Sequence, residues 1–272
     1  MSKEKAAIFV DNSNIFIGLF KFSKFLRKKG EIKENEYIRI KWEKILELLE
    51  AQNSGLDIYA RHFFASLPPA ADIRSLKHRP TEEEWDELVN KSAQSGFYRV
   101  IQNPPFNFTL HGIPLRFADV YCRTKMRQAY FKCKDAQKGN IQCGVNIDPE
   151  KCYSCDYKYL FKYEKGVDVA LAVQLILFSS QRSSNIDRII LVAGDGDYKE
   201  AAKFIRQEMG KDFQIVSWKY SLSKELEKIS NISSIYLEDN WKNLCEIRHR
   251  PLEETPAVLD EPEIDDVDQA EK

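Results

Sequence analysis

Aspartates beside apolar segments are the residues of this 272-residue chain with the clearest capacity for chemistry. Asp11 ends one apolar run, Asp168 begins a second, and Asp195 follows a third; Asp197 lies two residues after Asp195. If the first and third runs are parallel strands, their carboxyl ends meet at one edge of a sheet, where ligands bind. Carboxylates that converge there repel one another, and a hard divalent cation such as Mg²⁺ or Mn²⁺ is the usual resolution.

Each aspartate also has an explanation that involves no metal. Asp11 suits the N-cap of a following helix, and the helix dipole favours an anion such as Asp168 in a first turn. Asp197 and Glu200 have the spacing of a capping box. Because several of these residues are expected at the same sheet edge, their convergence favours a metal site over separate caps.

The elements that would position these residues alternate between strand and helix. Strands are expected at residues 6–10, 56–65, 97–101, 188–193 and 213–218. Helices are expected directly after Asp11, near residues 42, 81 and 167, and over 198–209. Residues 106–117 alternate like a β-hairpin around His111 and Gly112. The alternation predicts an α/β fold with a parallel sheet and helices on both faces.

Charge and composition divide the chain into a folded part and a tail. The 41 basic and 42 acidic residues nearly balance, but residues 251–272 hold nine acidic residues and one basic residue. We therefore expect one domain over 1–250, mildly basic, and an acidic disordered tail over 251–272. The apolar run near the start is too short for a signal peptide, and no apolar stretch reaches the roughly 20 residues of a membrane span. A cytoplasmic protein without a membrane partner is expected.

A cluster of cysteines suggests a second kind of metal site. Residues 123–165 lack periodicity and are rich in lysine, so we interpret them as an insertion. Four cysteines lie in it, the last two as a Cys-x-x-Cys knuckle: Cys133, Cys143, Cys152 and Cys155. Four thiolates suit a structural zinc ion, which would stabilise a segment with little apolar content. Reduced cysteines packed as small apolar residues, an iron–sulfur cluster and a redox pair are the alternatives. Cys122 and Cys245 have no partner at metal spacing.

Three sequence runs occur in the order of a known family: FVDNSN at 9–14, KGVDVAL at 165–171 and LVAGDGDY at 191–198. They resemble the signature blocks of the NYN domain, LabA-like branch, in the PIN-like nuclease superfamily. The resemblance spans about 6–237 and implies a Rossmann-like sheet of strand order 3-2-1-4-5. The acidic site would lie at the carboxyl ends of the first and fourth strands, where the residues themselves point. Many relatives lack the cysteine-rich insertion.

The resemblance also implies roles for individual residues. The metal-binding acids would be Asp11, Asp168, Asp195 and Asp197, with Asn14 holding the substrate or a metal-bound water. The implied activity is phosphodiester hydrolysis by a metal-dependent nuclease, with single-stranded RNA as the expected substrate. Basic side chains near the site are candidates for phosphate contacts, with surface solvation as the alternative: Lys165, Lys199 and Arg123.

Two other functions compete with the nuclease. One is a non-catalytic NYN module that binds RNA or a protein partner through the insertion and the tail, although the complete acidic set speaks against it. The other is a phosphatase with an aspartate nucleophile, which is disfavoured because Asp11-Asn12-Ser13 lacks a second aspartate two positions after the first. The sequence carries no signal for the oligomeric state.

Overall fold

The computed structural model describes residues 3–67, 93–114, 116–121, 158–163, 166–181 and 185–249. The chain folds into two units. The first comprises 1–68, 89–114 and 164–250, and the second comprises 69–88, 115–163 and 251–272. The expected helix near residue 81 and the acidic tail lie outside the described residues, so both stay predictions, as does the division into a domain over 1–250 and a tail.

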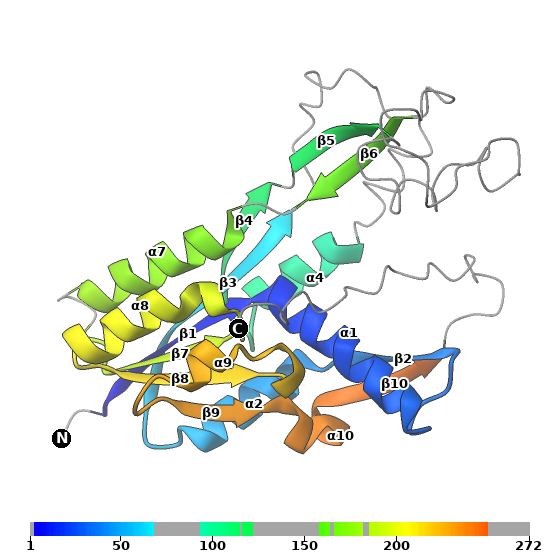
Figure 1. The fold of residues 1–272 in the computed structure, drawn as a ribbon. Helices are drawn as coiled ribbons and strands as arrows, with labels where there is room; N and C mark the ends of the chain where they lie inside the picture. Colours follow the sequence, from blue (N-terminus) through cyan, green and yellow to red (C-terminus); the bar gives the residue numbers. More distant parts are fainter. Residues whose placement is uncertain are drawn as a thin grey trace, which may run out of the picture. The chain divides into compact units, whose positions relative to one another are not determined.

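A six-stranded parallel sheet forms the centre of the first unit (Figure 1). Its order across the sheet is β4 (Thr109–Pro114), β3 (Asp57–Leu67), β1 (Lys5–Asp11), β7 (Arg188–Val192), β8 (Asp212–Ser217) and β9 (Ser233–Tyr236). Counted along the chain, these strands have the order 3-2-1-4-5-6. This differs from the predicted order 3-2-1-4-5 in two details, because β4 replaces the strand expected at 97–101 and β9 adds an edge strand. The strand order reverses between β1 and β7, which makes that position the topological switch point.

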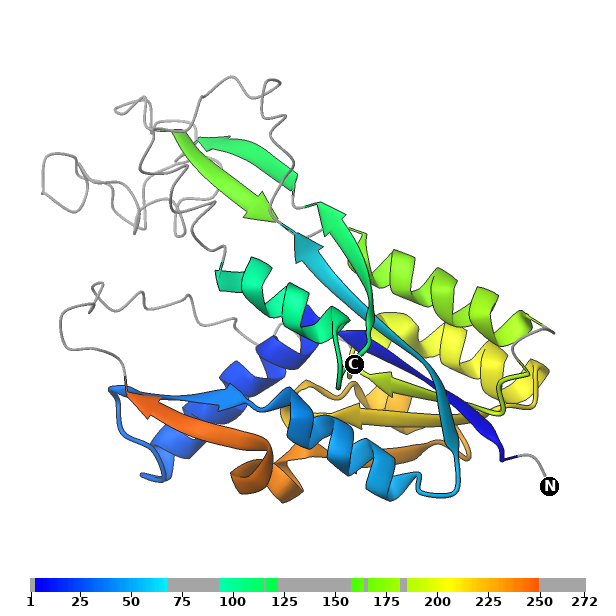
Figure 2. The same ribbon diagram turned by 180° about the vertical axis from the view of Figure 1, so that it is seen from behind.

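Alternate side chains of the strands face two apolar layers, because successive residues of a strand point to opposite faces. Ile8 and Val10 of β1 face the layer under α1 (Asn12–Lys28), α2 (Trp42–Gln52) and α4 (Ala93–Gln102). Ala7 and Phe9 face the layer under α7 (Val167–Ser180), α8 (Lys199–Lys203) and α9 (Lys224–Glu227). Figures 1 and 2 show these helices on the two faces of the sheet, as the sequence predicts for an α/β fold.

The expected strand at 97–101 is wrong, because these residues belong to α4. Their aromatic and β-branched content is typical of a strand, but Tyr98 and Ile101 are buried while Val100 is exposed. Burial at positions i and i+3 is the helical pattern. Packing of this face against Phe63 of β3 therefore overrides the local β-propensity.

The expected hairpin at 106–117 is also wrong. Residues 109–114 form β4, a continuous edge strand that pairs in parallel with β3 through His111 and Gly112. In the second unit, β5 (Arg116–Tyr121) pairs with β6 (Lys158–Tyr163) in antiparallel orientation. The expected insertion at 123–165 thus contains a strand near its end, whose partner lies just before the insertion.

Several short elements complete the described part of the first unit. A two-stranded antiparallel ribbon, which the sequence analysis did not anticipate, joins β2 (Glu36–Ile40) to β10 (Cys245–His249). The remaining helical segments are η3 (Gly196–Tyr198), η4 (Phe204–Glu208), η5 (Lys219–Ser221), η6 (Leu237–Asn240) and α10 (Trp241–Leu244). Among the helices that the structure describes, none combines the length and apolar character that a membrane crossing needs.

Candidate active site

Asp11 lies at the carboxyl end of the central strand β1 and is only 2% exposed. Its Oδ1 accepts a hydrogen bond of 3.0 Å from the backbone N–H of Asn14, so Asp11 is the N-cap of α1. The cap interpretation is therefore correct for this residue. The N-cap hydrogen bond uses Oδ1 of Asp11, and Oδ2 is left for a second partner.

Asn14 connects the ends of the two strands at the switch point. Its Oδ1 accepts a hydrogen bond of 2.7 Å from the backbone N–H of Gly194, which follows β7, and its side chain is buried. Asn14 thus joins the first turn of α1 to the loop after β7. Its expected role toward a substrate or a metal-bound water stays a prediction, since this carbonyl oxygen already binds the loop.

Asp168 reaches the same edge from the opposite face of the sheet. Gly166 is the N-cap of α7 with a φ of 97°, a left-handed conformation that glycine adopts without strain. The helix therefore starts at Val167, which is fully buried, and Asp168 follows in its first turn, half-buried.

Tyr198 brings Asp11 and Asp168 together. Its side chain is fully buried, and its hydroxyl donates to Asp11 Oδ2 at 2.6 Å and lies 3.1 Å from Asp168 Oδ1. Burial, followed by the charges and hydrogen bonds of the two aspartates, raises the pKa of Tyr198 far above its ordinary value. The phenol is therefore a neutral hydrogen-bond donor throughout the physiological range.

The role of Tyr198 was not predicted from the sequence. The available signal was its position, because it directly follows Asp197 in the acidic run at 195–197 and ends the 3₁₀ turn η3. An aromatic residue there also suits the start of the helix expected over 198–209, whose buried face needs apolar side chains. Tyrosine provides that apolar body together with a polar tip, and buried tyrosine hydroxyls usually have a partner.

Asp195 and Asp197 occupy the loop after β7. Asp195 Oδ1 accepts a hydrogen bond of 3.1 Å from the backbone N–H of Asp197 and caps η3, while the side chain of Asp197 is exposed. Within the described ranges, no group of three or more histidine, cysteine, aspartate or glutamate side chains is arranged to hold a metal ion. The four-aspartate ligand set therefore stays a prediction, with Asp11 and Asp168 as the pair that one hydroxyl links.

The chemistry of this pair fits a divalent cation. A phenol has one proton, so it cannot donate fully to two carboxylates, and the 2.6 Å distance assigns that proton to Asp11. The residue after Asp11 is Asn12, whose Oδ1 is buried without a hydrogen-bond partner among the described residues. The two carboxylates that the Tyr198 hydroxyl links are hard oxygen donors, which Mg²⁺ and Mn²⁺ prefer.

The expected phosphate contacts have different outcomes. Lys199 forms an ion pair with Glu225, and this hydrogen bond raises the pKa of Lys199. A phosphate contact by Lys199 would have to replace that pair, so the role stays a prediction. Lys165 and Arg123 lie outside the described residues, as do Cys133, Cys143, Cys152, Cys155 and Cys122. Cys245 is buried, and burial raises its thiol pKa to about 12.

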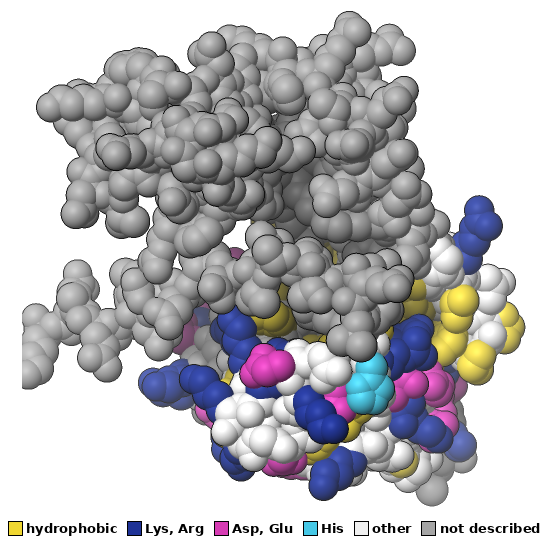
Figure 3. All heavy atoms as spheres, turned by 90° about the vertical axis from the view of Figure 1, so that its right-hand side faces the viewer, with side chains coloured by type: hydrophobic (Ala, Val, Ile, Leu, Met, Phe, Trp, Pro, Cys, Tyr) yellow, Lys and Arg dark blue, Asp and Glu magenta, His cyan; other side chains and the backbone are white. Residues whose placement is uncertain are grey.

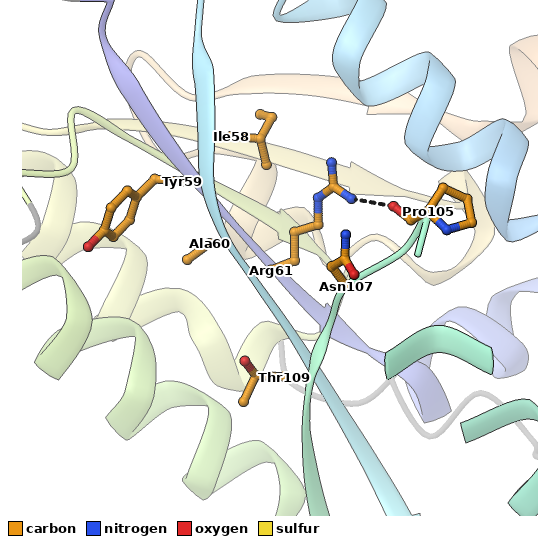
Figure 4. A pocket seen from close by; sticks show the side chains of 7 residues that line it. All are labelled: Ile58, Tyr59, Ala60, Arg61, Pro105, Asn107 and Thr109. Atoms are coloured by element: carbon orange, nitrogen blue, oxygen red, sulfur yellow. Dashed lines mark hydrogen bonds between the residues drawn. The ribbon is translucent and has the colours of Figure 1, made fainter. Parts of the chain in front are cut away.

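A hollow at the other end of the strands is not part of this site (Figure 4). It has a volume of about 380 Å³ and is lined by residues near the amino ends of β3 and β4. Arg61, which lines it, donates to the carbonyl oxygens of Pro105 and Phe106 and pairs with Glu50 of α2. The guanidinium of Arg61 therefore fastens the loop before β4.

Part of the sequence matches a known protein family. Residues 106–238 match the NYN domain. The family prediction is thereby confirmed for this segment, and NYN domains belong to the PIN-like nuclease superfamily. The NYN match contains Asp168, Asp195 and Asp197 and begins after Asp11 and Asn14. The LabA-like branch stays a prediction.

Two further comparisons accompany the NYN match. No curated protein matches the sequence. Among solved structures, a protein of unknown function from Vibrio parahaemolyticus aligns with 16% sequence identity and a TM-score of 0.45, over 90% of this chain and 97% of that chain.

The Gly194→Ala variant tests the packing behind the site. A Cβ at Gly194 would lie 2.7 Å from the carbonyl oxygen of Ser221 and 2.9 Å from Leu222 Cα, and backbone atoms yield less readily than side chains. We expect a loss of about 2 kcal/mol in the free energy of unfolding and a melting temperature roughly 4–8 °C lower. Gly55→Ala is the control, because a Cβ there meets nothing within 4 Å. Equal melting of the two variants would contradict this packing.

A histidine pair beside the sheet is a second feature that the sequence analysis missed. His62 Nδ1 and His111 Nε2 lie 3.0 Å apart on neighbouring strands, and His62 stacks on Phe9. Burial and, after it, the charge of His111 lower the pKa of His62 to about 4, and burial lowers that of His111. Both imidazoles are therefore neutral at pH 7, which allows one to donate to the other.

This pair predicts a loss of stability in mild acid. A histidine with a pKa of about 4 in the folded protein and 6.5 in the unfolded chain favours unfolding as the pH falls through that interval. Between pH 7 and pH 5 we expect His62 to account for about 1 kcal/mol of lost unfolding free energy, given its partial exposure. Urea unfolding should show a smaller pH effect for His62→Phe. The exposed His249→Gln should behave like the wild type, and an unchanged pH effect in His62→Phe would refute the assignment.

Proposed function

We propose that this protein is a metal-dependent nuclease that hydrolyses phosphodiester bonds of single-stranded RNA. The observation that supports it most is the linkage of Asp11 and Asp168 through the Tyr198 hydroxyl at the switch point of the sheet. Elements from both faces of the sheet bring these two carboxylates to the edge where open α/β sheets bind ligands. The NYN match adds the superfamily in which nucleases are found.

In such a reaction, some residues of the site would bind the metal ion and others would orient these ligands. Asp11 and Asp168 would hold the ion, with Asp195 and Asp197 on the neighbouring loop as further ligands. When bound, Mg²⁺ or Mn²⁺ supplies positive charge for the phosphoryl group and activates a water for attack. The Tyr198 hydroxyl and the backbone N–H of Asn14 fix the orientation of Asp11, so that this carboxylate needs little rearrangement before it acts.

The decisive experiment incubates the purified protein with labelled single-stranded RNA, single-stranded DNA and duplexes, in Mg²⁺, Mn²⁺ or EDTA. We expect cleavage of single-stranded RNA with either metal and no cleavage in EDTA. Binding of RNA without cleavage in any metal would instead support the non-catalytic NYN module. Cleavage that persists in EDTA would exclude the metal mechanism.

We also propose a structural zinc ion at Cys133, Cys143, Cys152 and Cys155. Their spacing supports it, because a Cys-x-x-Cys turn places two thiolates on one tetrahedral ion. Metal analysis should find about one zinc per chain, lost in Cys152→Ser and retained in Cys122→Ser, whose cysteine has no partner at metal spacing. Four reactive thiols in the native protein, with neither zinc nor iron present, would rule the site out.

A further inference from the structure

The solvent side of α1 combines large apolar side chains with lysines. Six residues of this helix are exposed and lie on one face, which we name the α1 outer face: Phe16, Ile17, Phe20, Lys21, Lys24 and Lys28. The opposite face of the same helix is buried in the core through Ile15, Leu19, Phe22 and Leu26. The core contacts of α1 are therefore made mainly by the face opposite the α1 outer face.

The aromatic rings on this face are unusually open to solvent. Phe16 is 45% exposed, Phe20 is 40% exposed and Ile17 between them is 54% exposed. The Lys24 ammonium lies 4.4 Å from the centre of the Phe20 ring. The attraction between this ammonium and the ring holds a positive charge directly against an exposed aromatic side chain.

The α1 outer face lies on the helix whose N-cap is Asp11, so its distance from the acidic site follows from helix geometry. Phe16 is five residues after Asp11, so the first ring lies about 1.4 helical turns, or roughly 7.5 Å along the axis, from the residue that caps the helix. Lys28 lies twelve residues after Phe16, which is about 18 Å farther along the axis. The apolar half of the face is thus next to the carboxylates, and the basic half leads away from them.

Charge on α1 has a single sign. Residues 12–28 contain four lysine and arginine side chains and no aspartate or glutamate, and Lys29 follows as the C-cap. On the side of the molecule toward which α1 runs in Figure 1, Figure 3 shows further Lys and Arg side chains, with acidic ones among them, over the described surface. The uninterrupted positive charge therefore belongs to α1 itself.

We infer that the α1 outer face binds single-stranded nucleic acid next to the cleaved bond, with bases stacked on Phe16 and Phe20 and phosphates on Lys21, Lys24 and Lys28. This inference rests on the proposed nuclease function, because it names the surface that holds the substrate strand. Proteins that bind single strands without reading sequence combine such aromatic rings with a basic track. The face would therefore favour unpaired strands over duplexes and show little base preference.

The lysines favour a nucleic acid over an apolar protein partner. An apolar helix face that docks on a protein is expected to continue along the helix, as it does on α7, where Val169, Val173 and Leu177 are exposed in one row. On α1 the apolar residues stop after Phe20 and lysines replace them at Lys21, Lys24 and Lys28. Phosphates spaced along a strand complement such a row of cations.

A binding experiment in EDTA tests the face without cleavage. A fluorescent 12-nucleotide RNA is titrated with the wild type, with Phe16→Ala/Phe20→Ala, and with the control Val173→Ala/Leu177→Ala, which removes two exposed apolar side chains at the same i, i+4 spacing from α7. We expect the phenylalanine double variant to bind about a hundredfold more weakly, roughly tenfold for each ring, and the control to bind like the wild type. The melting temperature of each variant is measured as well, so that affinities are compared only between folded proteins.

Two further variants separate stacking from general apolar contact. Phe16→Tyr/Phe20→Tyr keeps the flat rings and should bind within a few fold of the wild type. Phe16→Leu/Phe20→Leu keeps apolar area but removes the rings, so it should bind like the alanine double variant. Binding of the leucine variant at wild-type affinity, or equal binding of an RNA that lacks its bases, would overturn the inference that bases stack on this face.

Failure of this inference and failure of the nuclease proposal give different results. If the wild type cleaves RNA with Mn²⁺ while Phe16→Ala/Phe20→Ala binds and cleaves equally well, the face is not the strand-binding surface but the nuclease proposal survives. If the wild type cleaves no RNA while the double variant loses RNA binding, the α1 outer face is confirmed as an RNA-binding surface and the nuclease proposal is wrong. If the wild type does not bind RNA at all, the inference that the α1 outer face binds RNA is wrong.

Discussion

Asp11→Asn is expected to lower metal-dependent RNA cleavage about a thousandfold while the protein stays folded. The substitution removes the negative charge of a proposed metal ligand, and charge stabilisation by a metal ion amounts to several kcal/mol in the transition state. It keeps the N-cap, because asparagine accepts the same hydrogen bond from the backbone N–H of Asn14 as aspartate does. The new amide N–H₂ can donate to the Tyr198 hydroxyl, which then remains able to donate to Asp168.

The measurement compares initial cleavage rates and melting temperatures with those of Asp57→Asn. Asp57 is exposed at the amino end of β3, so its substitution removes the same charge at the opposite end of the sheet. We expect wild-type cleavage in Asp57→Asn. Cleavage by Asp11→Asn at the rate of this control would show that the proposed active site is wrong.

Tyr198→Phe should have the second largest effect, a loss of about a hundredfold in cleavage. The substitution keeps the buried ring but removes the hydroxyl that orients Asp11 and Asp168, and small misplacements of reacting groups have effects of this size. Asp11 Oδ2 loses its hydrogen-bond donor, which should lower the free energy of unfolding by about 1–3 kcal/mol in EDTA.

Metal dependence distinguishes a positioning role of Tyr198 from a purely structural one. Without the hydroxyl, a cation is the most direct relief of the repulsion between Asp11 and Asp168, so Mn²⁺ should raise the melting temperature of Tyr198→Phe more than that of the wild type. The control is Tyr236→Phe, which removes a hydroxyl that donates to Glu227 on the surface. An equal Mn²⁺ effect in all three proteins would argue against the role of Tyr198.

The sequence predicted the α/β fold class because buried parallel strands leave a strong local signal, whereas the strand order came from the resemblance to the NYN family. Residues 6–10 and 188–193 are almost continuously apolar, and β1 and β7 form there. The same local reasoning failed at α4, where FYRVI is typical of a strand. Its helical conformation depends on contacts of Tyr98 and Ile101 with a sheet far away in the sequence.

The candidate site was predictable in its charged residues but not in its hydrogen bonds. Parallel topology is enough to bring Asp11 and the loop after β7 to one edge. The direction of the Tyr198 hydroxyl and the contact of Asn14 with Gly194 depend on side-chain packing across the switch point, which has no local pattern in the sequence. The histidine pair was missed for the same reason, since 49 residues separate His62 from His111.

The central place of β1 in the sheet has a consequence for how the chain folds during synthesis. β1 pairs with β3 soon after both leave the ribosome, but its other edge waits for β7, because Asp11 and Tyr198 are 187 residues apart. Until β7 is made, that edge of β1 presents unpaired backbone groups, which can recruit strands of other chains. Contacts of such long range also slow folding. Nascent chains that end before β7 are therefore the species most exposed to aggregation.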